Sequence, residues 1–279
     1  SSNWHHDTSV HAADFYQNGV AQLLLPTTEL YSTSLAVMDI KTETVSYQLN
    51  IDSDATLKRV TGADANGDNI PDAIYSTSRG VEFVDVYNEA LIASYNTSSY
   101  NLSDFSAHYG EALNLAVAED TLKLLKSNGN NFVQLSSVDQ SCNRIAFFNY
   151  DQDPEQELLC LQVSEHHYQV HTATIYIYEI VNNVLQQVHQ QSLNEQVKDI
   201  VVSPTRTASQ ELILVIQNGK DWDSEVSSQL IYTDFRGYPL WSSPVFPGAV
   251  SGNAIKVRQD SKGKLNLLMS TSEAMYQIH

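Results

Sequence analysis

The segment D-A-N-G-D-N-I-P-D, which begins at Asp64, carries oxygen-bearing side chains at a spacing that suits a metal ion. With Asp64 as position 1, Asn66, Asp68 and Asp72 occupy positions 3, 5 and 9. This is the alternation of an EF-hand-type loop, in which alternate residues turn inward around a hard cation that takes roughly six to eight oxygens. Ile70, at position 7, would contribute its backbone carbonyl. The sequence therefore predicts a Ca²⁺ site formed by these residues.

The residues between these oxygens support the same interpretation. Gly67 and Asn69 tolerate the left-handed backbone that so tight a loop requires. Without a cation, the loop's carboxylates would repel one another; the alternative is an acidic turn that caps its own N–H groups and binds no ion. Position 12, where an EF-hand has a bidentate Glu, is Tyr75 within an apolar segment, so the loop should join two strands.

In this strand context the motif resembles the calcium-binding β-propeller repeat of the FG-GAP or integrin type, D-x-N/D-G-D-G-x-x-D followed by a strand. The motif is specific in this repeat, whereas the other repeats match it only as degenerate copies. The resemblance implies a β-propeller and a Ca²⁺ ion held between the first two strands of one blade.

A second acidic loop, N-Y-D-Q-D-P-E-Q-E, places Asn149, Asp151, Asp153 and Glu157 at the same four positions. Pro154 stands at position 6, where the motif has Gly, and its φ near −65° excludes a left-handed turn. This loop is either a second metal site or an acidic surface loop. The matching loops of the other repeats lack most of the carboxylates and should hold no ion.

Two further clusters are candidates for ligand binding. His167 and His171 would share a face of an extended segment as a transition-metal pair, or would simply belong to a polar loop. A sugar ring would suit the cluster of Asp221, Trp222 and Asp223. The indole would stack against the ring, and the two carboxylates would accept hydrogen bonds from its hydroxyls. The alternative for Trp222 is a side chain packed on a neighbouring part of the fold.

The elements that must position these residues recur along the chain. Each repeat has a β-like segment, a loop, a short apolar strand and a hairpin; the loops are expected to start near residues 14, 64, 106, 149, 203 and 258. Units of roughly 40–50 residues with four strands each are typical of β-propeller blades. The sequence therefore predicts an all-β fold, a β-propeller of about six four-stranded blades that forms a single domain over residues 1–279.

The last repeat raises a question about ring closure, because it stops at His279 after its third expected strand. The N-terminal segment, residues 1–9, is a candidate for the missing outer strand, since closure removes an exposed sheet edge. The alternative is a chain cut from a longer protein.

Composition limits the possible partners. The chain has 15 Lys and Arg against 33 Asp and Glu, a formal net charge of −18, which argues against binding to a nucleic-acid backbone. No apolar run approaches the roughly 18 residues of a membrane span, so we expect no membrane insertion. The chain has two cysteines, Cys142 and Cys160; an oxidising compartment would permit a disulfide between them, and the sequence leaves open whether they are bonded.

No common catalytic motif occurs in the sequence: it has no G-x-G pair, G-K-[ST], G-x-S-x-G or H-E-x-x-H. The sequence thus favours an extracellular, cell-surface or periplasmic calcium-stabilised module that binds or adheres to carbohydrate or protein. The alternatives are a propeller-type polysaccharide lyase or glycoside hydrolase, and a spacer domain of a larger surface protein without a ligand of its own.

Overall fold

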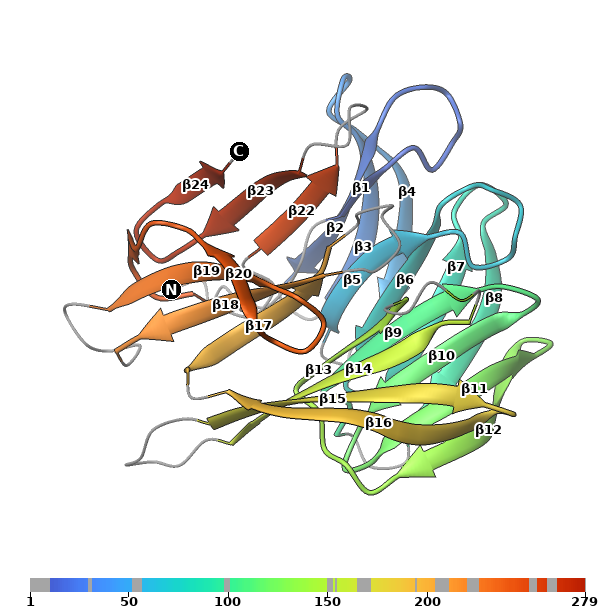
Figure 1. Ribbon diagram of the computed structural model, residues 1–279. Helices are drawn as coiled ribbons and strands as arrows, with labels where there is room; N and C mark the ends of the chain where they lie inside the picture. Colours follow the sequence, from blue (N-terminus) through green and yellow to red (C-terminus); the bar gives the residue numbers. More distant parts are fainter. Residues whose placement is uncertain are drawn as a thin grey trace. The chain divides into compact units, whose positions relative to one another are not determined.

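The structure is a computed structural model of the chain, in which the described residues form strands and turns and no helix. It describes residues 11–29, 32–51, 57–97, 101–149, 153, 155–164, 172–193, 195–203, 211–219, 226–250, 255–259 and 265–278. The strands form antiparallel sheets, numbered sheet 1 to sheet 6 in chain order (Figure 1). The chain divides into two compact units, Ser1–Gln140 and Ser141–His279.

The first unit contains three four-stranded sheets, each built from strands that are consecutive in the sequence. Sheet 1 consists of β1 (His11–Ala13), β2 (Gln22–Glu29), β3 (Ser32–Asp39) and β4 (Thr44–Ile51). Sheet 2 consists of β5 (Leu57–Ala63), β6 (Asp72–Thr77), β7 (Gly80–Asp85) and β8 (Ala90–Asn96). Sheet 3 consists of β9 (Asp104–Tyr109), β10 (Leu113–Ala118), β11 (Leu122–Asn128) and β12 (Asn131–Val138).

The second unit contains the other three sheets. Sheet 4 consists of β13 (Arg144–Phe148), β14 (Glu157–Ser164), β15 (Thr172–Val181) and β16 (Val184–Leu193). Sheet 5 consists of β17 (Val197–Val202), β18 (Leu212–Asn218), β19 (Ser227–Thr233) and β20 (Pro239–Ser242), with the short β21 (Phe246–Pro247) also paired to β19. Sheet 6 has three described strands, β22 (Ile255–Gln259), β23 (Leu265–Ser270) and β24 (Met275–Ile278).

The second strand of each sheet is the apolar strand of the repeat, and β18 shows why it is apolar throughout. Leu212, Leu214 and Ile216 pack in a core shared with sheet 4. Ile213 and Val215, on the opposite face, pack in a core shared with sheet 6. Because successive side chains of a strand point to opposite faces, a sheet covered on both sides needs apolar residues at every position.

The first unit is built in the same way. In β6, Ala73 and Tyr75 belong to the core between sheets 1 and 2, whereas Ile74 belongs to the core between sheets 2 and 3. Phe83 and Phe105, both buried, belong to the second of these cores. Buried apolar area on both faces is thus the main force that stacks neighbouring sheets.

The predicted loops fall mostly between the first and second strands of a sheet. Asp14, Asp64, Asn149 and Ser203 each follow directly on a first strand. Ser106 does not: it lies inside β9, paired with Ala116, and the β9–β10 connection is only residues 110–112. Arg258 also lies inside a strand, β22. A turn of three residues cannot present alternate oxygens around an ion, so sheet 3 has no counterpart of the acidic loops.

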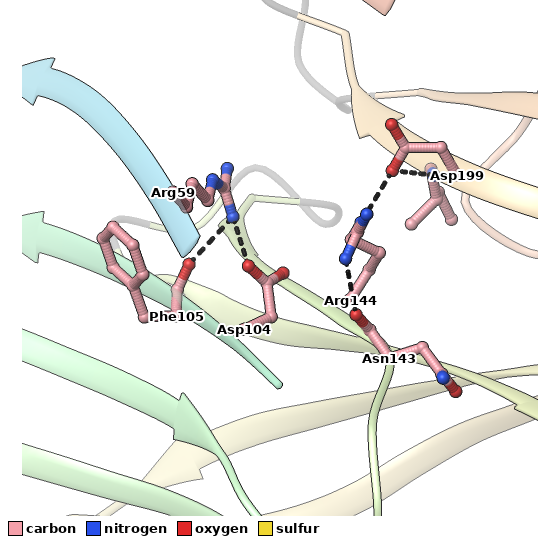
Figure 2. A network of polar contacts seen from close by, with 7 residues as sticks. Arg59, Asp104, Phe105, Asn143, Arg144 and Asp199 are labelled. Atoms are coloured by element: carbon pink, nitrogen blue, oxygen red, sulfur yellow. Dashed lines mark hydrogen bonds and ion pairs between the residues drawn. The ribbon is translucent and has the colours of Figure 1, made fainter. Parts of the chain in front are cut away.

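Two ion pairs repeat one arrangement, once in each unit (Figure 2). Arg59 of β5 pairs with Asp104 at the start of β9 and donates to the carbonyl of Phe105 at 3.1 Å. Arg144 of β13 lies with its Nε 3.0 Å from Oδ1 of Asp199 on β17. Both aspartates are buried, with 4% and 3% exposed. Each pair therefore joins the first strands of two neighbouring sheets and satisfies a carboxylate that burial would otherwise penalise.

A disulfide joins Cys142 to Cys160, within sheet 4. Both residues are buried, and the bond connects the segment before β13 to the middle of β14. The two cysteines, whose pairing the sequence left open, are therefore bonded.

Candidate metal centre

The loop of residues 64–72, here called the Asp64 loop, joins β5 to β6. Its ends are held together by the antiparallel pair Ala63 and Asp72. Gly67 has φ of 83° and Asn69 has φ of 66°, so both adopt the left-handed backbone that the sequence predicted. Gly67 is needed for a second reason: a Cβ atom there would lie 2.5 Å from the ring of Tyr109, which belongs to β9.

The side-chain oxygens of the Asp64 loop accept hydrogen bonds from its own backbone. The carboxylate of Asp64 accepts the N–H of Gly67 at 2.6 Å and that of Asn69 at 3.0 Å. Asn66 accepts from the N–H of Asp68 at 3.0 Å, and Asp68 accepts from that of Ile70 at 2.7 Å. A carboxylate has about four acceptor sites, so each of these groups keeps capacity for a further partner.

Asp72, at position 9, is almost fully buried, with 1% exposed. Its Oδ2 accepts the N–H of Ala65 at 2.8 Å. The pKa of the Asp72 carboxyl is raised to about 7, first by burial and then by the charges of Asp85, Asp68 and Asp64, although the hydrogen bond from Ala65 acts to lower it. The ionised loop therefore contains a carboxylate in an environment that disfavours its charge, and a cation would reverse that preference.

Asp85, at the end of β7, is a member of the site that sequence spacing did not indicate. It is 6% exposed, and its Oδ2 accepts from Nδ2 of Asn66 at 3.4 Å and from Nδ2 of Asn88 at 2.7 Å. Its Oδ1 accepts the backbone N–H of Asn88 at 2.8 Å. Asp85 thus orients the amide of Asn66, through a contact between the Asp64 loop and the end of β7 that no linear motif records.

The first loop of the chain, residues 14–22 or the Asp14 loop, repeats this backbone with a different charge. Positive φ occurs at the same two positions, at Gln17 (49°) and Gly19 (76°), as at Gly67 and Asn69. Of its residues only Asp14 is acidic. The loop shape therefore forms without a cluster of carboxylates.

The hydrogen bonds of the two loops also correspond. Asn18 Oδ1 accepts the N–H two residues further on at 2.9 Å, as Asp68 does. Gln22 Oε1 accepts the N–H seven residues before it at 2.8 Å, as Asp72 does. Neutral amides thus perform the structural roles of positions 5 and 9. The loop can therefore form these two hydrogen bonds without negative charge at positions 5 and 9.

The loop of residues 149–157, the Asn149 loop, is described only in part. The side-chain amide of Asn149 donates to the carbonyls of Asp153 and, at 3.2 Å, of Glu155. The N–H of Glu155 donates to Oδ1 of Asp153 at 2.9 Å, which is the bond that positions 5 and 7 make in the other loops. Glu155 is position 7, whose carbonyl would be a ligand of a bound cation. In the structure this carbonyl instead accepts a hydrogen bond from the side-chain amide of Asn149. Asp151 and Pro154 lie outside the described residues.

The donor chemistry of the Asp64 loop fits a hard cation. Carboxylates of Asp64, Asp68 and Asp72, the amide oxygen of Asn66 and the carbonyl of Ile70 are the ligand types that Ca²⁺ takes. They come from one loop; among the described residues no three His, Cys, Asp or Glu side chains are grouped as a metal cage, and this includes the carboxylates of Asp64, Asp68 and Asp72. Ca²⁺ accepts such variable geometry more readily than Mg²⁺ does.

The other predicted site residues fall where the structure gives no description. His167 and His171 lie in residues 165–171, and Asp221, Trp222 and Asp223 lie in residues 220–225. These ligand-binding predictions remain predictions.

A cavity of about 280 Å³ lies beside the Asp64 loop, in the first unit. Its lining combines sheet 2 with the end of the first strand of sheet 3: Ala63, Asp64, Ala65, Ile74, Ala107, His108, Tyr109 and Leu113. Burial lowers the pKa of His108, so this imidazole favours its neutral form. Nothing in the sequence marks Tyr109 and His108 as site residues, because the cavity that they line depends on the packing of two sheets.

Comparison with known proteins identifies the fold. No protein-family model matches the sequence, and no curated protein sequence is similar to it. The chain is similar to the structure of BBS1N in complex with ARL6DN, with TM-score 0.62 and 8% identity over 96% of this chain and 89% of that one. It is also similar to the WD40 domain of Toxoplasma gondii coronin, with TM-score 0.58 and 12% identity over 97% of this chain and 67% of that one. The Dos1 propeller is similar with TM-score 0.56 and 12% identity over 94% of this chain and 66% of that one.

The chain is therefore an all-β protein with the β-propeller fold, as the repeats predicted, and sheets 1 to 6 are its blades. It spans 66% of the length of the Dos1 propeller. The described residues include no helix long and apolar enough to cross a membrane.

Proposed function

We propose that this chain is a calcium-stabilised binding module that works outside the cytoplasm on a carbohydrate or an extracellular protein. The Asp64 loop would hold the ion through Asp64, Asn66, Asp68, Asp72 and the carbonyl of Ile70. Bound Ca²⁺ would offset two of the three negative charges that the loop carries when ionised and would fix the end of β5 relative to β6.

One observation carries the calcium proposal. The Asp14 loop has positive φ at the same two positions and makes the hydrogen bonds of positions 5 and 9 with the neutral Asn18 and Gln22 in place of Asp68 and Asp72. In the Asp64 loop these positions carry negative charge, and at Asp72 the charge is buried. Charge that the fold does not need, and that costs stability without a cation, is best explained by a cation.

The proposed location rests on two features. The bonded Cys142–Cys160 pair is of the kind that forms and persists in oxidising compartments. An exposed loop with five protein donors would bind Ca²⁺ weakly, with a Kd on the order of 10⁻⁴–10⁻³ M, as extracellular modules do. Both features suit the cell surface, the extracellular space or a periplasm.

The charge of the chain supports the proposed partners. With a net charge of −18, the surface repels anionic ligands and favours neutral or cationic ones. Neutral glycans and basic patches of proteins meet that requirement, whereas nucleic acids do not.

Thermal unfolding of the full chain, stripped of metal and then titrated with Ca²⁺, tests the calcium site. At an ion concentration of about 10–100 times Kd, binding to the folded state adds roughly 1.5–3 kcal/mol, a rise in Tm of about 3–8 °C. Asp68→Asn should lose most of this rise, because the Asn keeps the bond from the N–H of Ile70, as Asn18 does in the Asp14 loop, but supplies no charge. Asp120→Asn, which also removes one exposed aspartate of the first unit, should retain it.

A Tm that does not respond to Ca²⁺ would sink the calcium proposal. So would an Asp68→Asn variant that responds as fully as the unsubstituted chain. The binding role itself is tested separately, by screening the metal-loaded chain on a glycan array and against basic extracellular proteins.

A further inference from the structure

The cavity beside the Asp64 loop has the form of a small ligand site. It opens between blades 2 and 3, with Ile74 and Leu113, both buried, at its base. Its volume of about 280 Å³ is at the lower end of the roughly 300–1,000 Å³ of ligand pockets. We propose that this cavity binds a single neutral sugar ring; the inference rests on the proposed binding function and gives it a ligand class and a place.

Small side chains create the cavity. Three of its lining residues are alanines, Ala63, Ala65 and Ala107, at positions where larger apolar residues would fill the space between the blades. Ala65 is 2% exposed, so the wall continues directly into the core between blades 2 and 3. The shape is therefore supported by packed strands rather than by free loops, which favours a preformed site.

Tyr109 supplies an aromatic face at the rim. It is 38% exposed, and its ring lies against the backbone of Gly67, so closely that a Cβ added there would be 2.6 Å from the Tyr109 hydroxyl. A partly exposed ring held in place in this way offers the apolar surface on which the C–H face of a sugar packs, and its hydroxyl can donate to or accept from the ligand.

Asp64 supplies hydrogen-bond acceptors in the same cavity. Each oxygen of its carboxylate accepts one backbone N–H, from Gly67 or Asn69, which fixes its orientation. About two of its four acceptor sites remain for other donors. A sugar hydroxyl is such a donor, and it can bind while another site of the same carboxylate faces a cation.

The charges around the cavity select against ionic ligands. Its lining contains a carboxylate and no Lys or Arg, so a phosphate or carboxylate ligand would be repelled without compensation. An ammonium ligand would pair with Asp64 in the metal-free loop, but Ca²⁺ would remove that attraction. A neutral polyol is accepted in both states.

Saturation-transfer NMR on the full chain with Ca²⁺ tests the proposal, with methyl glycosides of glucose, galactose, mannose, fucose and N-acetylglucosamine as probes. Glucosamine and glucose 6-phosphate serve as cationic and anionic comparators. We expect transfer to at least one neutral probe, with millimolar Kd. Ala107→Leu and, at the exposed rim, Ala63→Leu should each abolish it by filling the cavity, whereas Ala90→Leu, on the exposed start of β8, should not.

Substitution at the aromatic rim sharpens the test. Tyr109→Ala should lower the affinity for the neutral probe by about tenfold, a loss of roughly 1.4 kcal/mol in binding free energy, because the stacking face is removed. Tyr109→Phe should lower this affinity by only about two- to threefold. Binding that is unchanged in both cavity-filling variants, or transfer to glucosamine alone, would overturn the proposal.

The outcome is separable from that of the calcium site. Asp68 does not line the cavity, and Ala107 and Ala63 offer no ligand to a metal. A normal Ca²⁺ response in Tm without sugar transfer refutes the sugar site alone. Sugar transfer with no Ca²⁺ response refutes the calcium site alone and leaves the sugar site standing.

Discussion

Replacing Asp72 by Asn removes the buried charge of the Asp64 loop and keeps its hydrogen bond. The carboxyl is 1% exposed, and its pKa is raised from an ordinary value of 3.8 to about 7, first by burial and then by the charges of Asp85, Asp68 and Asp64. The Asn can still accept the N–H of Ala65, as Gln22 accepts the equivalent N–H of Phe15.

The sign of the pH dependence follows from the direction of this shift. Between about pH 4 and pH 7 the folded state holds a proton that the unfolded state has released, so stability falls as pH rises through this window. At about 1.36 kcal/mol per pH unit, the loss is complete above pH 7 and reaches at most roughly 4 kcal/mol. Solvent and counter-ions that reach the outer part of the loop reduce it below that limit.

Urea unfolding of the metal-free chain, followed by fluorescence at pH 4, 5.5, 7 and 8, measures the effect. Asp72→Asn should match the unsubstituted chain at pH 4 and be more stable by about 1–4 kcal/mol at pH 8. With saturating Ca²⁺ the order should reverse, because the unsubstituted chain gains the ion and the variant does not. Asp120→Asn, at an exposed position, controls for the loss of one negative charge.

The reasoning fails if the stability difference between Asp72→Asn and the unsubstituted chain stays the same from pH 4 to pH 8. It also fails if the variant is the less stable protein at pH 8 without metal, since the bond to Ala65 would then depend on the charge.

Three further predictions concern the scaffold. Arg59→Met should lower the stability by roughly 3–5 kcal/mol in urea unfolding, because it removes the cation that pairs with the buried carboxylate of Asp104. Arg59→Met combined with Asp104→Leu should recover much of the loss; a single variant as stable as the unsubstituted chain contradicts this. Gly67→Ala should lower the free energy of unfolding more than Gly19→Ala does. Both glycines have positive φ, which alone accounts for about 1–2 kcal/mol, but a Cβ at Gly67 would meet Tyr109, whereas a Cβ at Gly19 would meet nothing within 4 Å. Equal losses of stability would show that the Tyr109 ring does not constrain the loop. Reduction of the Cys142–Cys160 bond, which spans 18 residues, should cost about 3 kcal/mol; an unchanged Tm after reduction confirmed by mass spectrometry would refute it.

The fold could be predicted because its strongest signals are local. The apolar strand before each hairpin reads as continuous, since both faces of β6 and β18 are covered. The turn at Asn182 and Asn183 has φ of 52° and 65°, as a two-residue hairpin requires. Ser106 lies in a strand and does not start a loop, because β9 continues to Tyr109, with Phe105, Ala107 and Tyr109 at alternate positions.

The candidate site could be predicted only in its linear part. The oxygen spacing from Asp64 to Asp72 is visible in the sequence because one loop supplies it. Asp85 and Tyr109 could not be found, since their contacts join residues 19 and 42 positions apart through the pairing of strands and the packing of two blades. The sequence also could not show that Gln22 and Asp72 accept equivalent hydrogen bonds in their loops. Glutamine is neutral and has a longer side chain than aspartate, so the two residues do not look alike in the sequence.

The disulfide also has a mechanical consequence. It links the entry to the second unit, at Cys142, directly to β14, and so closes a covalent ring around β13 and the Asn149 loop. Tension pulled along the chain would pass through the sulfur bridge into β14 and leave the 17 residues between the cysteines unloaded. A protein anchored at a surface and stretched by flow or by a bound partner would thus keep β13, with its Arg144–Asp199 link to the next blade, shielded from force as long as the bridge is intact.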